Sequence, residues 1–270
     1  MRADFHKALS SGVPQLGYCV CYPSPGVVER VGPDWDWYWL DGQHGQLGYD
    51  QMLALVRACD LVSRPAFVRV PGHEPCNIGL ALDMGATGVI VPCVDTPEEA
   101  RAIVNAAKFP PLGKRSYGGR RPIDREGRGY SDQANSETLL IIQIETPTGI
   151  ENVREIASLP GVDGLFLGPD DIMLRRCHPM SAPRSKETLG EDMHAVVTAC
   201  KEVGIYSVMV GVGGEMLDLC LDMGFHMIVA CGDVPSLANT SRIASDDARA
   251  RVSGRSKKNP ADAPSGGGVY

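Results

Sequence analysis

The chain has 270 residues, of which 43% are hydrophobic, and its 26 basic and 33 acidic side chains give a formal net charge of −7. This length suits one α/β barrel of about 250 residues, and the negative charge argues against nucleic acid or an anionic membrane as a partner. No segment approaches the roughly 18 consecutive apolar residues of a membrane helix, and the N-terminal sequence lacks the apolar core of a signal peptide. We therefore expect a cytoplasmic, single-domain protein.

Short β-rich runs alternate with longer helical patterns along the chain, which is typical of βαβ units and a parallel sheet. Most of the runs are continuously apolar, as expected for strands that are buried on both faces. Eight strands predict a closed (β/α)8 TIM barrel of class α/β, and a doubly wound open sheet is the alternative. The predicted strands are Gln15–Val20, Trp37–Leu40, Ala66–Val70, Gly88–Pro92, Leu139–Ile144, Gly164–Leu167, Tyr206–Val210 and Met227–Ala230.

Helical periodicity is clear in residues 51–59 and 97–107, and a faint repeat supports the barrel. In that repeat, residues 80–85 and 219–224 both read Leu-x-Leu-Asp-Met-Gly and precede a strand. We expect the barrel domain to cover residues 1–253, with Ser236–Val252 as its last helix. Residues 254–270 are polar and rich in Pro and Gly, which predicts a disordered tail.

The nine cysteines lie mostly in apolar runs and form no CxxC pair. We interpret them as small buried residues of a reducing compartment, so neither disulfides nor a zinc knuckle is indicated. Those in apolar runs are Cys19, Cys21, Cys93, Cys200, Cys220 and Cys231.

Two acidic residues follow neighbouring strands, at the carboxyl end of the strands, where the active sites of TIM barrels lie. Glu145 comes directly after the fifth strand, and Asp171 lies in the Gly-Pro-Asp-Asp turn after the sixth. Two hard oxygen ligands in adjacent βα units suit Mg²⁺ or Mn²⁺, with Co²⁺ as a third candidate. The alternative is that these carboxylates bind no metal and only cap a helix or lie in a loop.

A second group of polar residues follows the second and third strands. Asp41 precedes His44 by three residues, so its carboxylate could orient the imidazole of a general base. Arg69 ends an apolar strand, where a guanidinium needs an anion, either a substrate carboxylate or enolate or a structural partner inside the barrel. His44 could equally be structural.

Three further motifs have open interpretations. Residues 211–215, Gly-Val-Gly-Gly-Glu, could bind an anion or only form a tight turn. The basic, Gly-rich residues 114–121 could cover the active site or form a solvated loop. Trp35, Trp37 and Trp39 alternate at strand spacing, and we expect their rings to pack on one face of the second strand, in the core or in an oligomer interface.

Over roughly residues 5 to 245 the sequence resembles the HpcH/HpaI aldolases, the metal-dependent class II pyruvate aldolases. The family includes 4-hydroxy-2-oxoheptanedioate and 2-keto-3-deoxy sugar-acid aldolases. The resemblance depends on several ordered motifs and not on any one of them. They are Leu-Asp-Gly-Gln-His-Gly at 40–45, Val-Arg-Val at 68–70, Leu-Asp-Met-Gly-Ala at 82–86, Val-Pro-Cys-Val-Asp-Thr-Pro-Glu-Glu-Ala at 91–100, Phe-Pro-Pro-Leu-Gly-Lys-Arg at 109–115, Gln-Ile-Glu-Thr at 143–146 and the run ending Gly-Pro-Asp-Asp at 161–171.

The resemblance implies specific roles for these residues. Glu145 and Asp171 would hold the metal, and His44 would be the catalytic base with Asp41 orienting it. The remaining positions would contact the 2-oxo acid substrate; they are Arg69, Gln143, Gly168 and Asp170. Gln43 stands where many sugar-acid aldolases of the family have Glu, which leaves the subfamily open.

The expected reaction splits a 4-hydroxy-2-oxo acid into pyruvate and an aldehyde through a pyruvate enolate, or runs in reverse. No predicted strand ends in the lysine that a Schiff-base aldolase needs. Alternatives are another metal–enolate lyase, decarboxylase or hydrolase of an oxo acid or a citryl-CoA-like substrate, or a non-catalytic metabolite-binding barrel. The resemblance also implies a hexamer built as a trimer of dimers.

The stretch after Asp171 departs from the family, because Ile-Met-Leu-Arg-Arg-Cys-His is bulky and basic where small polar residues are common. We hypothesise that Arg175 or Arg176 meets a distal anionic group of the aldehyde. The alternative is that these arginines cap a helix or bridge to another subunit.

Overall fold

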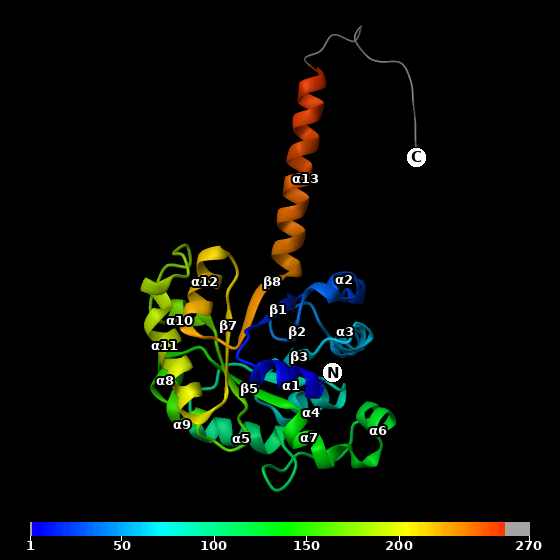
Figure 1. Cartoon of the computed structure of the whole chain (residues 1–270), viewed down its shortest axis with the longest axis vertical. Coiled ribbons are helices and arrows are strands. Elements are labelled where there is room, and N and C mark those ends of the chain that lie inside the picture. The colour runs from blue at the N-terminus through cyan, green and yellow to red at the C-terminus, as the bar shows by residue number, and fades with distance from the viewer. Residues whose placement is uncertain (1, 257–270) are drawn as a thin grey trace. The chain divides into compact units, whose positions relative to one another are not determined.

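The computed structural model describes residues 2–256 and contains a closed barrel of eight parallel strands with the order β1 to β8 (Figure 1). Each strand pairs with the next one along the chain, and β8 pairs with β1. We call the end formed by the carboxyl ends of the strands the mouth and the opposite end the base. The strands are β1 Gln15–Val20, β2 Trp37–Asp41, β3 Ala66–Arg69, β4 Gly88–Val91, β5 Leu139–Ile144, β6 Gly164–Leu167, β7 Tyr206–Val210 and β8 Met227–Gly232.

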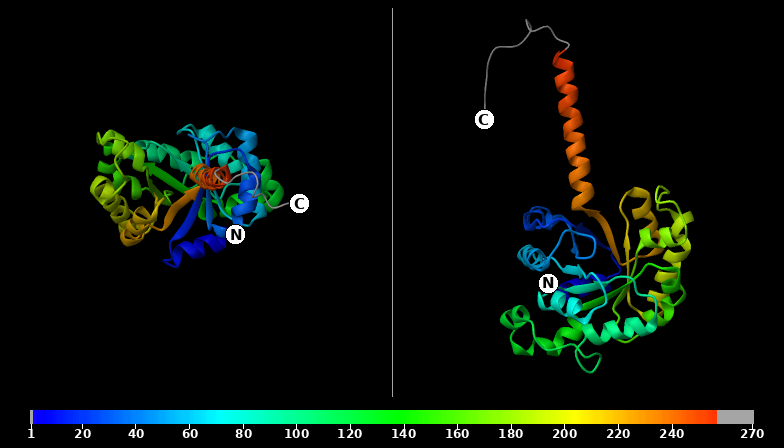
Figure 2. Two further views of the ribbon diagram at one scale, coloured as in Figure 1. Left: turned by 90° about the horizontal axis from the view of Figure 1, so that it is seen from above. Right: turned by 180° about the vertical axis from the view of Figure 1, so that it is seen from behind.

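Within residues 2–233, helices follow the strands and lie on the outside of the barrel (Figure 2). Before β5 the chain adds extra short helices, and α1 precedes the first strand. The helices are α1 Arg2–Ser10, α2 Pro25–Val31, α3 Tyr49–Leu61, α4 Pro75–Asp83, α5 Pro97–Ala107, α6 Arg120–Glu126, α7 Ser131–Glu137, α8 Pro147–Glu151, α9 Val153–Ala157, α10 Pro169–Arg175, α11 Lys186–Val203, α12 Gly214–Met223 and α13 Asp233–Ser256, with 3-10 turns η1 Gly32–Asp34 and η2 Arg128–Tyr130.

The predicted TIM barrel is therefore confirmed and the open sheet is wrong. All eight predicted strands exist, and four of them have the expected bounds. The others differ by one or two residues at the carboxyl end, where β2 extends to Asp41 and β8 to Gly232. The continuously apolar runs predicted the positions of the strands, because a parallel strand inside a ring of helices is buried on both faces.

Large rings from β2 and β3 fill the interior of the barrel. Trp37 meets Phe67 edge-on with ring centroids 5.4 Å apart, and Phe5 of α1 packs on the same Phe67 at 5.8 Å. Gly17, the register partner of Trp37, makes room for this ring, since a Cβ there would lie 2.4 Å from the indole. Trp35 precedes the strand and packs on Tyr18 in the outer layer, so the expectation of one shared face holds only for Trp37 and Trp39.

The outer layer buries the other face of each strand beneath the helices. The repeated Leu-x-Leu-Asp-Met-Gly motif ends α4 and α12, and its glycines, Gly85 and Gly224, have φ values of +86° and +82°. A left-handed residue after a helix is the usual C-terminal stop, and glycine adopts it without strain. The repeat therefore marks the same local structure, a helix end with a glycine stop before the next strand, at two places in the barrel.

The first and last strands close the barrel with help from Asp233, the residue after β8. Its carboxylate accepts hydrogen bonds from the backbone N–H groups of Cys21 at 2.9 Å and Tyr22 at 2.8 Å. The Asp233 residue is only 1% exposed. One buried carboxylate therefore fixes the loop after β1 against the end of β8.

The chain divides into two compact units, Met1–Asp233 and the segment from Val234 onward. The second unit contains α13, a polar helix with exposed side chains and an i,i+4 ion pair between Arg251 and Asp247 at 2.7 Å. The predicted last helix is confirmed. The predicted tail is helical at residues 254–256 and otherwise lies outside the described residues, and the domain boundary at residue 253 stays a prediction. In the described part, no helix is both long and apolar enough to cross a bilayer.

Candidate active site

Each candidate residue lies at the mouth, where its strand ends. Asp41 is the last residue of β2, and its register partner on β3 is Arg69. Glu145 follows β5 directly, while Asp171 lies in the first turn of α10, just after β6. The parallel topology brings these positions to one end of the barrel, as the sequence predicted.

Asp41 and Arg69 form a buried, two-pronged ion pair. Nε of Arg69 donates to Oδ1 of Asp41 at 2.9 Å, and Nη2 donates to Oδ2 at 2.7 Å. The guanidinium also lies 4.5 Å from the ring centroid of Trp39, so the ring face supports the cation. Among the described residues, Nη1 of Arg69 makes no hydrogen bond. The pair therefore fixes the arginine while leaving one of its amino groups available.

The environment of Asp41 keeps its carboxyl group ionised. Burial alone raises the pKa of this carboxyl, but the hydrogen bonds and charge of Arg69, together with the backbone N–H groups of His44 and Gln43, outweigh burial and lower the pKa below its ordinary value. These N–H groups donate to Oδ1 at 3.2 and 3.1 Å. Asp41 is thus a fixed anion that organises both Arg69 and the turn after β2.

His44 lies in this turn, and its side chain is exposed. The sequence suggested that Asp41 orients the imidazole, but Asp41 instead binds the His44 backbone, and no hydrogen bond to the imidazole is present within residues 2–256. The turn needs its glycines, because a Cβ on Gly42 would lie 2.6 Å from the carbonyl oxygen of Arg69 and one on Gly45 would lie 2.3 Å from that of Asp41. Asp41 therefore positions His44 through the backbone.

Glu145 is a buried carboxylate with three donors around it. The backbone N–H of Cys93 donates to Oε1 at 2.7 Å, and the Cys93 thiol donates to the same oxygen at 2.9 Å. Nε2 of Gln143 donates to Oε2 of Glu145. The other amide atom, Oε1 of Gln143, is buried and has no partner among the described residues. Gly168 clears the space beside Glu145, since a Cβ there would lie 2.5 Å from Oε2. The backbone N–H of Gly168 donates to the carbonyl oxygen of Ile144 at 2.9 Å.

Electrostatics link Asp171 to this group. Burial raises the pKa of the Cys93 thiol to about 12, and the hydrogen bond and charge of Glu145 and the charge of Asp171 act in the same direction. The charges of Glu145 and Asp171 therefore both favour the protonated form of this thiol. Asp171 does not cap α10, because the N-cap is Gly168 and no side chain caps the helix. The capping alternative is therefore wrong for this residue.

Trp39 connects the two halves of the site through the barrel interior. It lies under Arg69 and meets Phe166 of β6 edge-on at 5.3 Å. Phe166 is in turn the register partner of Gln143. A continuous packed layer therefore supports both the Asp41–Arg69 pair and the Gln143–Glu145 pair.

The acidic and basic residues around α10 mostly pair with each other. Asp170 is exposed and accepts two hydrogen bonds from Arg184 at 2.8 and 2.6 Å, so its predicted substrate contact stays a prediction. Arg176 binds the buried Asp192 of α11 at 2.8 and 2.5 Å. Arg175 has a looser contact, 3.7 Å from Asp171. Within the described part of the chain, Arg176 is therefore held by a buried partner, whereas Arg175 has only this long contact with Asp171.

The basic, Gly-rich residues 114–121 are bound to the scaffold by ion pairs. Arg115 pairs with Asp83 at the end of α4, and Arg121 binds Asp60 in the last turn of α3. Helices in this fold run opposite to the strands, so their ends lie at the base, and the idea of a lid over the mouth is wrong. After β7, Gly213 has φ +93°, which is consistent with the turn reading of residues 211–215.

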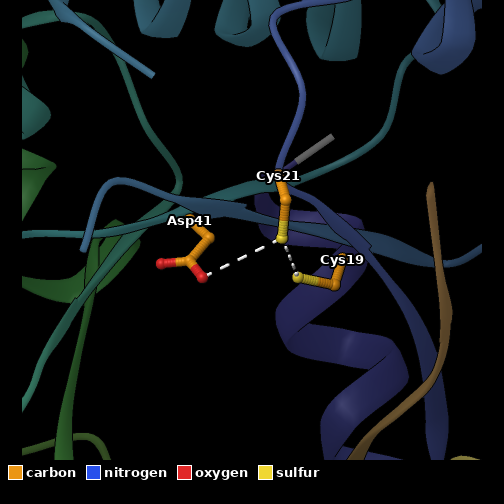
Figure 3. A group of neighbouring side chains, drawn as sticks. All are labelled: Cys19, Cys21 and Asp41. Atoms are coloured by element: carbon orange, nitrogen blue, oxygen red, sulfur yellow. Dashed lines mark hydrogen bonds between the residues drawn. The ribbon is translucent and has the colours of Figure 1, made fainter. Parts of the chain in front are cut away.

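Sequence reasoning missed the cysteines of the site. Besides Cys93, the Sγ atoms of Cys19 and Cys21 lie 3.7 Å apart, and Sγ of Cys21 is 4.0 Å from Oδ2 of Asp41 (Figure 3). The Cys-x-Cys spacing at the end of a strand was the available signal. These three thiols are therefore not merely apolar filler.

Comparisons with known proteins show which family the chain belongs to. The model of the HpcH/HpaI aldolase/citrate lyase family matches residues 28–240. A 4-hydroxy-2-oxovalerate aldolase of Novosphingobium aromaticivorans is 38% identical over 211 residues, 76% of this chain and 80% of the relative. A hydroxypyruvate/pyruvate aldolase of Rhizorhabdus wittichii is 35% identical over 246 residues, 89% and 96% of the two chains. The crystal structure of a HpcH/HpaI aldolase/citrate lyase family protein from Burkholderia cenocepacia superposes with a TM-score of 0.83 at 27% identity, covering 92% of this chain and 100% of that one.

Proposed function

Since the chain belongs to the HpcH/HpaI aldolase/citrate lyase family and is an aldolase, a carbon–carbon lyase, we propose that it cleaves 4-hydroxy-2-oxo acids to pyruvate and an aldehyde at the mouth. The observation that carries this proposal is the fixed Arg69 cation at the same end of the barrel as the buried Glu145 carboxylate. Arg69 can bind the carboxylate or the 2-oxo oxygen of a 2-oxo acid, and the Glu145 carboxylate can hold a divalent cation that binds the same substrate.

Glu145 and Asp171 would hold the divalent cation of this metal-dependent family, with Mg²⁺ or Mn²⁺ as first candidates and Co²⁺ as a third. The donor set fits, because two carboxylates and the unpartnered Oε1 of Gln143 are hard oxygen atoms. When bound, the cation supplies the Lewis acidity that lowers the cost of forming an enolate.

Arg69 would bind the carboxylate or 2-oxo oxygen of the substrate and stabilise the negative charge that develops in the reaction. Asp41 and Trp39 hold it in place beforehand, so little rearrangement is needed. A preorganised donor of this kind contributes about 3–4 kcal/mol. Gln143 and Gly168 would contact the same end of the substrate.

His44 would act as the general base that removes the proton of the C4 hydroxyl group during cleavage. Its exposed imidazole can reach a bound substrate, while Asp41 fixes its backbone. After cleavage the imidazole holds the proton until the pyruvate carbanion takes one up. Gln43 stands beside it in place of the Glu of many relatives.

Among the described residues, the one buried lysine does not support a Schiff-base mechanism. Lys108 is buried, but its Nζ donates to Asp163 at 2.6 Å, to the Thr138 carbonyl at 2.7 Å and to the Asn135 carbonyl at 3.1 Å. An ammonium group with all three protons engaged is a poor nucleophile.

The test is a pyruvate-release assay across 4-hydroxy-2-oxo acids, with and without Mn²⁺. We expect metal-dependent pyruvate formation that is lost in Arg69→Met and kept in Arg154→Met, a change at an exposed arginine. If no acid in the panel gives pyruvate while a citryl-CoA analogue or oxaloacetate is turned over, another metal–enolate reaction replaces the proposal.

The assembly we propose is a hexamer, a trimer of dimers. Light scattering on the purified protein tests this, and a single species of 28.9 kDa would contradict it.

A further inference from the structure

Cys19 and Cys21 form a cluster with Asp41, and the proposed reaction uses neither of these two thiols. Their ligand atoms all lie within 4.8 Å of one another, and they come from β1, the residue just after β1 and the end of β2 (Figure 3). Tyr22 and Cys21 have their backbone N–H groups bound by Asp233, so the loop that carries the second thiol is fixed.

The distances match those around a tetrahedral cation with two sulfur ligands. Two thiolates at about 2.3 Å from zinc lie roughly 3.8 Å apart, and a sulfur and a carboxylate oxygen lie roughly 3.6 Å apart. The observed distances are 3.7 Å between the sulfur atoms and 4.0 Å from Cys21 Sγ to Asp41 Oδ2. Small side-chain movements would therefore complete the site.

The charges around the cluster also suit a divalent cation. Two thiolates and the Asp41 carboxylate carry three negative charges, which a divalent cation and the Arg69 guanidinium balance. Binding releases the two thiol protons to solvent. The carboxylate oxygen Oδ2 accepts from Arg69 and still has a lone pair that faces Cys21.

We propose that Cys19, Cys21 and Asp41 bind a thiophilic divalent cation of the zinc class, at a second site that is distinct from the Glu145–Asp171 site. The soft sulfur ligands select against Mg²⁺, which keeps the two sites chemically separate. The binding does not depend on the proposed aldolase reaction, although the site shares Asp41 with it.

The experiment is a titration of the full chain with Cd²⁺ in excess Mg²⁺ and a phosphine reductant, followed by thiolate-to-metal charge-transfer absorption and by proton release. We expect one tight equivalent of Cd²⁺ and two protons released. Cys19→Ser and Cys21→Ser should each weaken binding by more than the roughly 10–100-fold that loss of a supporting hydrogen-bond partner costs. Asp41→Asn should weaken it less.

Matched controls locate the site. Cys76→Ser and Cys177→Ser remove exposed thiols, Cys93→Ser removes the thiol beside Glu145, and Glu145→Gln removes the other carboxylate; all four should keep the band. A band that disappears with Cys93→Ser and survives Cys21→Ser overturns the proposal. So does a wild-type protein that shows no thiolate band with Cd²⁺, which keeps the test decisive even if a cysteine variant fails to fold.

Discussion

The barrel has an ion pair with a buried cation at each end, and the two pairs differ in which hydrogen-bonding groups they leave without a partner. At the base, the ammonium group of Lys108 donates hydrogen bonds to Asp163 and to two backbone carbonyl groups, so all three of its protons are engaged. Asp163 also accepts a hydrogen bond from the N–H of Leu140 at 2.6 Å. At the mouth, Arg69 is held by Asp41 but its Nη1 makes no hydrogen bond with the described residues, and Oε1 of Gln143, at the same end of the barrel, has no partner among them either.

This difference separates a stabilising pair from a functional one. A buried charge with every donor engaged can only hold the fold together, whereas a fixed charge with a free donor can still bind a ligand. We therefore expect substitutions at the mouth to lower activity more than stability, and substitutions at the base to do the reverse.

The largest expected effect is at Glu145. Glu145→Gln removes the buried charge that would hold the metal, so Mn²⁺ binding and aldol cleavage should both fall to background while the fold persists. Calorimetric titration with Mn²⁺ and circular dichroism measure this. Asp170→Asn, in the neighbouring turn, is the control and should keep its Mn²⁺ affinity; an unchanged affinity in Glu145→Gln would reject the site.

His44→Ala should slow cleavage by roughly 10²–10⁴ because a positioned general base is lost, with pyruvate binding largely retained. Single-turnover kinetics and pyruvate titration separate the two quantities. His194→Ala, at an exposed position on α11, serves as the control. If pyruvate affinity collapses and the chemical step keeps its rate, His44 binds substrate and is not the base.

Lys108→Met tests the other end of the barrel. It leaves Asp163 without its cation and should cost about 3–5 kcal/mol in the free energy of unfolding, measured with urea. Below the unfolding transition, kcat should remain close to wild type. Lys114→Met, an exposed neighbour, should change neither quantity. A large loss of activity in folded Lys108→Met would show that the two ends are not independent.

Arg175 and Arg176 allow a finer comparison within one helix. Arg175→Ala should reduce a preference for succinic semialdehyde over butanal by about tenfold, since one guanidinium–carboxylate contact is lost. Arg176→Ala should instead lower stability, because Asp192 loses its partner. If wild type and Arg175→Ala both use the two aldehydes equally well, the hypothesis that Arg175 binds a distal anionic group of the aldehyde is wrong.

The smallest expected effect is the pH dependence of the Asp41–Arg69 pair. Because the pKa of Asp41 is lowered in the folded state, its contribution to stability is fully present above about pH 4 and is lost as the pH falls through the folded-state pKa. The gap in unfolding free energy between wild type and Asp41→Asn should therefore shrink in acid, by about 1.4 kcal/mol per pKa unit of the shift. A gap that grows in acid would contradict the pairing.

The sequence was most informative where one local rule decided the structure. Apolar runs gave the strands, and the residues after them, such as Glu145 and Asp171, lie at the mouth because parallel strands share one polarity. It was least informative where a contact depends on register between strands. Asp41 pairs with Arg69 because they are opposite each other on β2 and β3, which no local pattern reveals.

The basic loop and the cysteines show the same limit. For residues 114–121 the sequence left two interpretations open, a cover over the mouth and a solvated loop, but their partners, Asp60 and Asp83, end helices at the base. Cys21 and Cys93 looked like apolar filler because their chain neighbours are apolar, while the groups they meet lie 20 and 52 positions away. Charge partners at such separations become visible only once the barrel is closed.

The carboxylate of Asp233 has a consequence for the order of events during synthesis. It binds the loop at Cys21 across a separation of 212 positions, so almost the whole barrel must leave the ribosome before that loop can take its final form. Contacts this distant in the chain form late and slow folding. Until then β1 has no β8 to pair with, and its edge and two thiols are open to chaperones, oxidants and other nascent chains.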